Sequence, residues 1–367
     1  MPNAHITGWG MAVPENVMTN DDLAKVVDTN DAWIRERTGI GERRIARDTD
    51  FTSTLAVDAS IQALKVANVR PTDIDLIICS TSTPEYMFPA TACLIQDQLG
   101  ATKAGAFDLL AACSGFIYAL NMGAQAIRSG SIKTALVIGS ETLSRFVNWK
   151  DRNTCILFGD GAGAFVLQAS ERPGGVLSAV MHSDGSGGDL LTLPAGGSRN
   201  PINENTFHEG KHYIQMDGKE VFRFATRVMA SATQEALDAA GLKVEDIRWV
   251  VPHQANIRII EAAARGLKLP MDRFVVNLDR YGNTSTASIP IAMVEAIEKG
   301  QIKSGDKFVM VGFGAGLTWG ALAAEWTGPI PSKGHVHPEQ YRRLGRVRSL
   351  VRRFIRFIEG LLYRREL

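Results

Sequence analysis

A cysteine at the start of an apolar segment is the residue in this sequence best suited to chemistry. Cys113 lies within residues 107–120, where an apolar run is followed by small residues, a glycine and a second apolar segment of helical character. This pattern predicts an extended segment that delivers the cysteine to the N-terminus of a buried helix. Unpaired backbone N–H groups and the helix dipole would favour the thiolate there. A lone cysteine more often packs as a small apolar residue. The assignment of Cys113 as a nucleophile therefore requires catalytic partners elsewhere in the chain.

An internal repeat indicates where such partners lie. Residues 63–78 recur as 236–251 with matched pairs 173 positions apart, and residues 126–133 recur as 296–303 at a spacing of 170. In both copies a helical segment leads through a turn into an apolar run, which is typical of α/β layers with mixed sheets. The sequence therefore predicts two similar α/β halves, residues 1–172 and 173–327.

The same spacings place two polar residues beside the cysteine. Asn283 lies 170 positions after Cys113, and His253 lies 173 positions after Ser80, where the first predicted strand ends. A pseudo-twofold packing of the halves would bring these strand ends and helix starts together at the centre. Cys113, His253 and Asn283 are therefore the predicted catalytic residues.

A glycine-rich stretch at residues 311–320 follows the last strongly apolar strand. It contains neither a Gly-Lys-Ser/Thr sequence nor a G-x-G-x-x-G that opens a helix, so it does not fit a phosphate loop. It fits a turn that presents backbone N–H groups to an oxyanion, at Gly314, Ala315 and Gly316 together with Cys113. We interpret the similar stretch at residues 158–164 as a site of close packing.

Trp33 and Arg37 are four residues apart on a predicted helix whose cap is Thr29 or Asn30. An aromatic ring beside a guanidinium is suited to stacking on a base and binding a phosphate. Taken alone, this pair is more commonly a packed tryptophan next to a surface arginine.

The composition is that of a globular protein of 367 residues, with 45% hydrophobic and 22% charged residues. No apolar run reaches the roughly 20 residues that span a bilayer, and the N-terminus does not resemble a secretory signal. Four cysteines without a C-x-x-C pair indicate neither a disulfide framework nor a zinc site. We therefore expect a cytoplasmic protein without a metal.

The net charge of +1 is unevenly distributed. Residues 328–367 contain ten Lys/Arg and three Asp/Glu, a net charge of +7, so the rest of the chain carries −6. Because the basic charge is confined to one terminal segment, a nucleic-acid partner is disfavoured.

The pattern of the basic segment predicts a linker followed by an amphipathic helix. Residues 328–334 are rich in proline and glycine, and apolar residues recur at three and four positions between 339 and 362, up to Leu361 and Leu362. Three interpretations remain open: docking on the body or on a second subunit, peripheral contact with an anionic membrane surface, and recruitment of an acidic partner. We expect weak, salt-sensitive binding to anionic vesicles.

Together and in this order, these motifs resemble the β-ketoacyl-acyl-carrier-protein synthase III family, the initiating condensing enzymes of type II fatty-acid synthesis within the thiolase superfamily. The resemblance covers about residues 3–327 and includes the sequences at 28–34, 111–116, 158–163, 252–256, 282–285 and 312–316. Thiolases resemble a Cys-His-Cys arrangement and the elongating ketosynthases a Cys-His-His one. Asn283 with no histidine beside it in the sequence matches the initiating type.

The resemblance implies a five-layered α-β-α-β-α fold of two similar halves with mixed sheets, assembled as a homodimer. It also implies a decarboxylative condensation of a short acyl-CoA with malonyl-acyl carrier protein, which gives 3-oxoacyl-acyl carrier protein, coenzyme A and CO2. Coenzyme A enters as a thioester substrate, and no other cofactor is implied. A starter-loading relative from polyketide or other secondary metabolism is the alternative, and a non-catalytic scaffold is a remote one.

The family's remaining site residues transfer by the same resemblance. Those for coenzyme A are Thr29, Trp33, Arg37, Arg152 and Asn256, with Trp33 and Arg152 on the two faces of the adenine. Phe88 would line the acyl pocket of the partner subunit. The carrier protein would meet Arg223, Arg258 and Arg265. Lys219 stands where relatives often have asparagine for the pantetheine arm, so that contact departs from the pattern.

Overall fold

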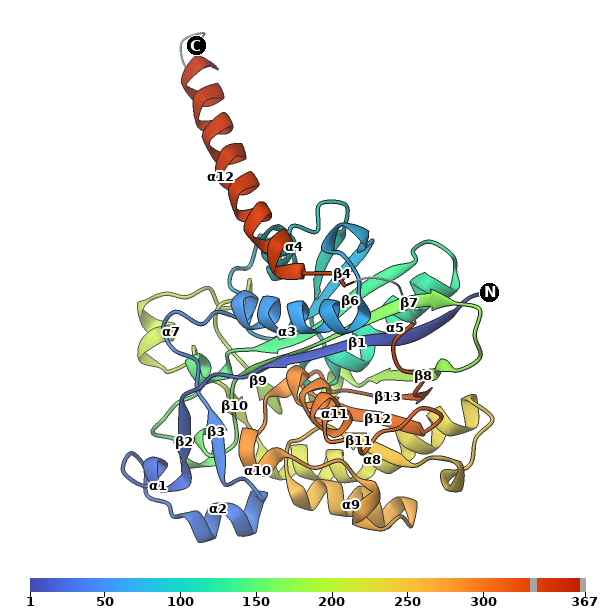
Figure 1. The fold of residues 1–367 in the computed structure, drawn as a ribbon. Helices are drawn as coiled ribbons and strands as arrows, with labels where there is room; N and C mark the ends of the chain where they lie inside the picture. The colour runs from blue at the N-terminus through green and yellow to red at the C-terminus, as the bar shows by residue number, and fades with distance from the viewer. Residues whose placement is uncertain (331–334, 364–367) are drawn as a thin grey trace.

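Two mixed β-sheets form the framework of the molecule, in a computed structural model that describes residues 1–330 and 335–363. Residues 331–334 of the predicted linker and residues 364–367 lie outside the described part, as do the side chains of 361–363, which include Leu361 and Leu362. Five layers alternate between helices and sheets, as Figure 1 shows.

The first sheet has the strand order β1-β7-β6-β4-β5 and the second the order β11-β12-β13-β8. In the first, β4 is parallel to β5 and β6, while β7 is antiparallel to both of its neighbours. In the second, only β11 and β12 are parallel. The first sheet consists of β1 (Asn3–Ala12), β4 (Leu76–Ser80), β5 (Gly105–Leu109), β6 (Thr134–Glu141) and β7 (Gly161–Ser170). The second consists of β8 (Gly175–Ser183), β11 (Trp249–Pro252), β12 (Lys307–Gly314) and β13 (Thr318–Glu325).

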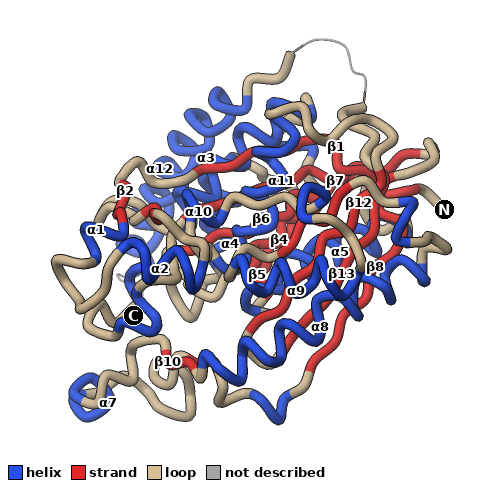
Figure 2. Tube along the Cα trace, turned by 90° about the horizontal axis from the view of Figure 1, so that it is seen from below, coloured by secondary structure: helices blue, strands red, loops and turns tan. Residues whose placement is uncertain are grey.

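Long helices fill the other three layers (Figures 1 and 2). The outer face of the first sheet carries α3 (Thr52–Ala67) and α4 (Thr91–Leu99). Between the sheets lie α5 (Gly115–Arg128) and α11 (Ser288–Glu298). On the far side of the second sheet, α8 (Gly218–Ala239) packs beside α9 (Ile257–Leu267). The expected α-β-α-β-α fold is confirmed.

Short elements connect these layers. Two small sheets pair β2 (Val17–Thr19) with β3 (Glu42–Arg44), and β9 (Leu191–Thr192) with β10 (Gln215–Met216). The short α-helices are α1 (Asn20–Leu23), α2 (Asp31–Thr38), α6 (Arg152–Cys155), α7 (Glu204–His208) and α10 (Leu278–Tyr281). The 3-10 turns are η1 (Pro71–Asp73), η2 (Ala112–Ser114), η3 (Leu143–Phe146), η4 (Gly185–Gly187), η5 (Val244–Asp246), η6 (Met271–Arg273) and η7 (Ser285–Ala287).

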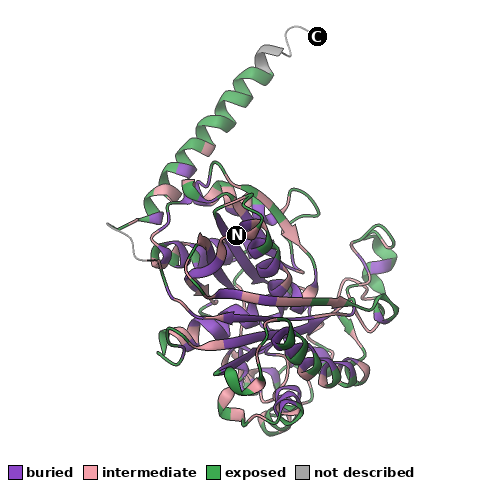
Figure 3. Cartoon of the chain, turned by 90° about the vertical axis from the view of Figure 1, so that its right-hand side faces the viewer, coloured by how far each residue is buried: buried purple, intermediate pink, exposed green. Residues whose placement is uncertain are grey.

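Buried residues fill the sheets and the central helices (Figure 3), and the large apolar clusters lie between the sheets and on the outer face of each sheet. Every residue of β6 is buried, because helices cover this central strand on both faces. In contrast, α8 buries one stripe of residues and exposes the other to solvent, as expected for an outer helix. No helix among the described residues is both long and apolar enough to cross a membrane.

The internal repeat is visible in the element boundaries. The turns η2 and η7 begin 173 residues apart, at 112 and 285, and so do β6 and β12, at 134 and 307. The spacing of 170 holds only at the ends of the two central helices, Arg128 and Glu298, because α11 is the shorter helix. The alignment of Cys113 with Asn283 was therefore wrong, since the counterpart of Cys113 is Thr286.

Glycines in the stretch 158–164 allow the central helix α11 to approach the first sheet. A Cβ atom on Gly163 would lie 2.6 Å from Cβ of Pro290, and one on Gly161 would lie 2.9 Å from Cδ1 of Ile291. Such distances leave no space for a side chain. The interpretation of this stretch as a close-packing site is confirmed.

The C-terminal segment forms the long helix α12 (Pro338–Tyr363). Its first turns contact α3 and α4, and the remainder extends away from the body (Figures 1 and 3).

Candidate active site

Cys113 lies in the sharp turn η2, between strand β5 and helix α5, as the sequence predicted. Ala112, directly before it, has a positive φ of 45°, a conformation that costs about 1 kcal/mol or more for a residue other than glycine. Ser114 stabilises the turn, since its hydroxyl lies 2.8 Å from the carbonyl oxygen of Ala111. The thiol is therefore held at the mouth of a central helix, with 6% of the residue exposed.

The glycine-rich turn contacts the cysteine turn directly. A Cβ atom on Gly314 would lie 2.6 Å from the backbone nitrogen of Cys113, so only glycine fits there. Thr318 joins the two turns, because its hydroxyl lies 3.1 Å from the Ala111 carbonyl and 3.0 Å from the Ala315 carbonyl. Ala315 and Gly316 connect β12 to β13, and the structure thus brings all four predicted oxyanion residues into one region.

His253 directly follows strand β11, and its backbone N–H donates to the Val311 carbonyl at 2.8 Å. The ring is buried, with its edge against Phe313 at a centroid distance of 5.3 Å. Burial lowers the pKa of His253 to about 3, so the imidazole is neutral at physiological pH.

Ser288, the first residue of α11, orients this imidazole. Its Oγ lies 2.7 Å from Nδ1 of His253 and accepts a hydrogen bond from the backbone N–H of Gln254 at 3.3 Å. The hydroxyl has one proton and two lone pairs, so it can donate to Nδ1 while it accepts from Gln254. A Ser288 hydroxyl that donates to Nδ1 places the ring proton of His253 on Nε2, where it can serve as a hydrogen-bond donor.

Asn283 is held by its backbone and oriented by its side chain. Its N–H donates to the Leu157 carbonyl at 2.8 Å, and its own carbonyl accepts from Gly159 N–H at 3.0 Å. The side-chain oxygen accepts from the Ser285 N–H at 2.8 Å. This bond leaves the amide NH2 group of Asn283 as the donor directed to a ligand.

Ser285 connects Asn283 with the cysteine. Its side chain lies beside the thiol and lowers the thiol pKa, but burial has the larger and opposite effect, and the pKa of Cys113 rises to about 12. The resting residue is therefore a thiol. The predicted thiolate was wrong, because loss of hydration outweighs the benefit of a helix N-terminus.

Glu141 is a buried carboxyl group behind this network. Desolvation raises its pKa to about 7, although it accepts hydrogen bonds from the Thr83 hydroxyl at 2.7 Å and the Ser82 N–H at 3.1 Å. The Ser285 side chain lies beside this carboxyl group and, like Thr83 and Ser82, lowers its pKa. A chain of polar contacts thus runs from Cys113 through Ser285 to Glu141.

Sequence reasoning missed Ser285, Ser288 and Glu141. Ser285 ends the motif at 282–285, where Asn283 alone was assigned a role, and Ser288 lies three residues beyond it. Glu141 could have been identified from the sequence, because it is the one charged residue in the apolar run 134–141. A carboxyl group at the end of a fully buried strand calls for a polar partner.

Trp33 is the centre of a second, surface-exposed cluster. The guanidinium carbons of Arg37 and Arg152 lie 4.7 and 5.0 Å from the centroid of its ring. Asn256, the N-cap of α9, donates from its side chain to the Arg37 carbonyl at 3.0 Å. Thr29 has a buried hydroxyl oxygen without a hydrogen-bond partner. The structure therefore gathers these five predicted coenzyme-A residues around α2, whose N-cap is Asn30.

The remaining predicted residues lie on the surface. Phe88 is 85% exposed, and Lys219 is exposed near the start of α8. Arg223 pairs with Glu220 at 2.9 Å, and Arg258 stacks over Phe222 at 5.5 Å, so these two arginines lie on the adjacent helices α8 and α9. Arg265 is exposed two turns beyond Arg258 on α9.

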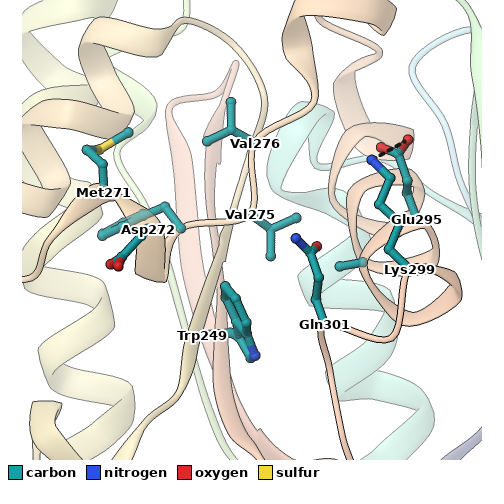
Figure 4. A pocket seen from close by; sticks show the side chains of 10 residues that line it. Trp249, Met271, Asp272, Val275, Val276, Glu295, Lys299 and Gln301 are labelled. Carbon is teal, nitrogen blue, oxygen red and sulfur yellow. Dashed lines mark ion pairs between the residues drawn. The ribbon is translucent and has the colours of Figure 1, made fainter.

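A cavity of about 360 Å³ lies at the opposite end of β11 from His253. Figure 4 shows Trp249, at the start of the strand, together with Glu295 and Lys299 on its wall. Since Trp249 and His253 are four residues apart on an extended segment, this cavity is about 13 Å along the strand from the imidazole. It is separate from the cluster around Cys113. Among the described residues, no group of His, Cys, Asp and Glu side chains is arranged to hold a metal ion.

Comparisons with known proteins match nearly all of the chain before α12. The family model described as 3-Oxoacyl-[acyl-carrier-protein (ACP)] synthase III matches residues 107–185, and the model of its C-terminal part matches residues 237–326. A Beta-ketoacyl-[acyl-carrier-protein] synthase III from Roseiflexus sp. is 52% identical over 324 residues, which cover 88% of this chain and 98% of the relative.

Solved structures of similar proteins match the same part of the chain. The crystal structure of 3-oxoacyl-[acyl-carrier-protein] synthase III from Aquifex aeolicus is 48% identical with a TM-score of 0.82, and the match covers 88% of this chain and 100% of that one. The priming beta-ketosynthase from the R1128 polyketide biosynthetic pathway is 36% identical with a TM-score of 0.83, covering 90% and 98%.

The raised thiol pKa predicts slow alkylation of Cys113 at neutral pH. Since only the thiolate reacts, the rate with iodoacetamide, followed by peptide mass spectrometry, should rise about tenfold per pH unit with no plateau up to about pH 10. The exposed Cys93 reports on reagent quality in the same sample. A plateau with a midpoint below about pH 8 would restore the thiolate interpretation.

Proposed function

The chain belongs to the β-ketoacyl-acyl-carrier-protein synthase III family, and we propose that it condenses a short acyl-CoA with malonyl-acyl carrier protein to start fatty-acid synthesis. The observation that carries this proposal is the convergence of Cys113, His253 and Asn283 through two serines of one segment, Ser285 and Ser288. The products are 3-oxoacyl-acyl carrier protein, coenzyme A and CO2.

Acyl transfer to Cys113 is the first half-reaction. The sulfur attacks the thioester carbonyl, a bond forms between them, and the thiol proton leaves with the sulfur of coenzyme A. The Ser285 side chain stabilises the negative charge on Cys113 as the proton departs. Covalent transfer divides one difficult reaction into two easier ones.

Loss of CO2 from the malonyl group is the second half-reaction. The electron pair of the broken C–C bond passes into the thioester, whose oxygen becomes negative. The Nε2–H of His253 and the NH2 group of Asn283 donate hydrogen bonds to that oxygen. Neutral donors suit this task, because a nearby carboxylate would repel the developing charge.

Carbon–carbon bond formation completes the cycle. The carbanion attacks the acyl carbonyl on Cys113, and the backbone N–H groups of Cys113 and the turn Gly314–Gly316 receive the second oxyanion. Collapse of this intermediate releases the 3-oxoacyl product, and the cysteine takes a proton from solvent. The contact between Gly314 and the Cys113 nitrogen supports this assignment.

Coenzyme A binds at the Trp33 cluster in this proposal. Arg152 and Arg37 already stack on the indole ring, so an adenine takes its place against Trp33 as Arg152 moves outward. The unpartnered hydroxyl of Thr29 offers a hydrogen bond at the nucleotide end. Arg223, Arg258 and Arg265 on α8 and α9 form a basic surface for the acidic carrier protein.

We also propose that the enzyme is a cytoplasmic homodimer. Strand β5 is an edge strand with the half-exposed Phe107 on it and the exposed Leu110 directly after it, and the loop between β4 and α4 exposes Tyr86, Met87 and Phe88. An uncovered edge with such a patch favours pairing with a second copy. Phe88 would then enter the acyl pocket of the partner subunit. The C-terminal helix is a candidate for peripheral contact with the inner membrane surface.

A starter-loading function in secondary metabolism is the second candidate, since the chain is also 36% identical to a priming ketosynthase of a polyketide pathway. Product analysis with malonyl-acyl carrier protein separates the two functions. A 3-oxoacyl product with acetyl-CoA as starter supports initiation of fatty-acid synthesis.

Substitution of the nucleophile tests the first half-reaction. Cys113→Ala should abolish the acyl adduct that wild-type protein forms with radiolabelled acetyl-CoA, because the adduct forms on the Cys113 sulfur. Cys93→Ala, which removes an exposed cysteine, is the matched control and should keep the adduct. Labelling of Cys113→Ala at the wild-type level would refute the assignment.

Substitution of the donors tests the second half-reaction. Asn283→Ala or His253→Ala should slow malonyl decarboxylation by about 10²–10³-fold, as removal of an oxyanion donor does. Acylation of Cys113 should remain within about tenfold, because these donors face the malonyl thioester. Asn283→Asp should be at least as slow as Asn283→Ala, since it adds a negative charge. Equal losses in both half-reactions would contradict these roles.

A further inference from the structure

Among the described residues, helix α12 contacts the body through its part up to Arg352. Arg342 pairs with Asp58 of α3 at 2.8 Å, and Gly345 lies against Gly100, where an added Cβ would come within 3.1 Å of the Gly100 Cα. Arg348 and Arg352 lie beside Asp97 and Gly100, at the end of α4. After these residues the helix extends from the body (Figures 1 and 3).

The face that contacts the body is the polar face of the helix. At about 100° per residue, the contacting residues Arg342, Gly345, Arg348 and Arg352 fall on one side of the helix axis. Docking an amphipathic helix on a globular body normally buries its apolar stripe. Here the opposite arrangement is found, so docking on this body does not explain the apolar residues.

The apolar face consists of eight large side chains that are 39–67% exposed: Leu344, Val347, Leu350, Val351, Phe354, Ile355, Phe357 and Ile358. They occupy an arc of roughly 160°, at about 100° per residue. Among the arginines of the described part of the helix, Arg343 falls within it, near the docked end, and those from Arg346 to Arg356 lie outside it. The helix therefore separates apolar and basic residues along its free part.

The charge of α12 is of one sign over most of its length. Residues 340–358 contain seven arginines and no aspartate or glutamate. Pairing with a second α12 would bring these arginines together without the acidic partners that stabilise coiled coils, and the apolar arc is wider than a two-residue seam. An arginine-rich face opposite phenylalanine, leucine and isoleucine is the pattern of helices that lie in a membrane interface.

We propose that α12 binds the surface of an anionic membrane. The eight apolar side chains enter the boundary between headgroups and acyl chains, and the flanking arginines bind lipid phosphates. Since the body contacts the opposite, polar face, this orientation leaves the body on the aqueous side of the helix. The matches to the family models end at residue 326, before α12 begins. Membrane binding by α12 therefore does not depend on the reaction proposed for the body.

Vesicle flotation with the full-length protein tests the proposal. The protein should float with phosphatidylcholine vesicles that contain about 30 mol% phosphatidylglycerol and remain in the bottom fraction with phosphatidylcholine alone. Binding should fall at least tenfold at about 0.5 M NaCl, because salt screens the arginines. Equal binding to both vesicle types, or none to either, would overturn the proposal.

Two pairs of variants separate the faces of the helix. Arg353→Gln with Arg356→Gln should weaken vesicle binding about 30-fold, because each arginine near an anionic surface strengthens binding about fivefold. The control pair Arg70→Gln with Arg199→Gln on the body should not weaken it. Phe354→Ser with Ile358→Ser should weaken it at least tenfold, whereas the matched pair Phe207→Ser with Ile202→Ser, also exposed, should leave it unchanged. Unchanged binding of the Phe354/Ile358 variant would exclude insertion of the apolar face.

Other occupants of the apolar face give different results. If an acidic carrier protein were the partner, purified carrier protein would bind the wild type but not the Arg353/Arg356 variant, and vesicles would bind neither. If a second copy covered the face, the Phe354/Ile358 variant would change the mass measured by light scattering. Either result would overturn the proposal.

Discussion

The active site depends on one segment, residues 283–288, which enters the centre of the molecule where the two sheets face each other. Asn283 belongs to the site itself, Ser285 contacts Cys113, and Ser288 contacts His253. Thr286 anchors the segment to the first sheet, because its hydroxyl donates to Ser80 Oγ at 2.8 Å. Its shape is constrained by close packing, since a Cβ on Gly139 would lie 2.5 Å from the Thr286 carbonyl oxygen. A small shift of this segment would therefore move Asn283 and disturb the contacts of Cys113 and His253, the three proposed catalytic residues.

Burial determines the protonation states of Cys113 and His253. It raises the pKa of the Cys113 thiol and lowers that of the His253 imidazole, so both groups rest uncharged. A neutral site has a chemical advantage for a reaction that creates negative charge on oxygen twice. Donors that carry no charge lower the energy of each oxyanion without forming a stable ion pair with the starting carboxylate.

The apolar runs and the repeat predicted α/β layers with mixed sheets because both can be recognised in the amino-acid sequence itself, and the family resemblance implied the five layers. The strands at 76–80 and 249–252 and the cysteine before a central helix follow from such patterns. The pKa of Cys113 did not follow, because it depends on how much water is excluded by residues distant in sequence. Ser288 was missed for a similar reason: its role requires the relative placement of β11 and α11. The tail helix was predicted, but only the structure shows that its polar face contacts the body.

The central claim is that His253 is a neutral donor whose proton resides on Nε2. The most direct measurement is ¹⁵N NMR of its imidazole between about pH 5 and pH 8, assigned by comparison with His253→Ala. We predict the chemical shifts of the neutral Nε2–H tautomer, unchanged across this range, and a redistribution of the proton between the two nitrogens in Ser288→Ala. Titration with a midpoint near 6.5, or a proton on Nδ1 in the wild type, would contradict the account.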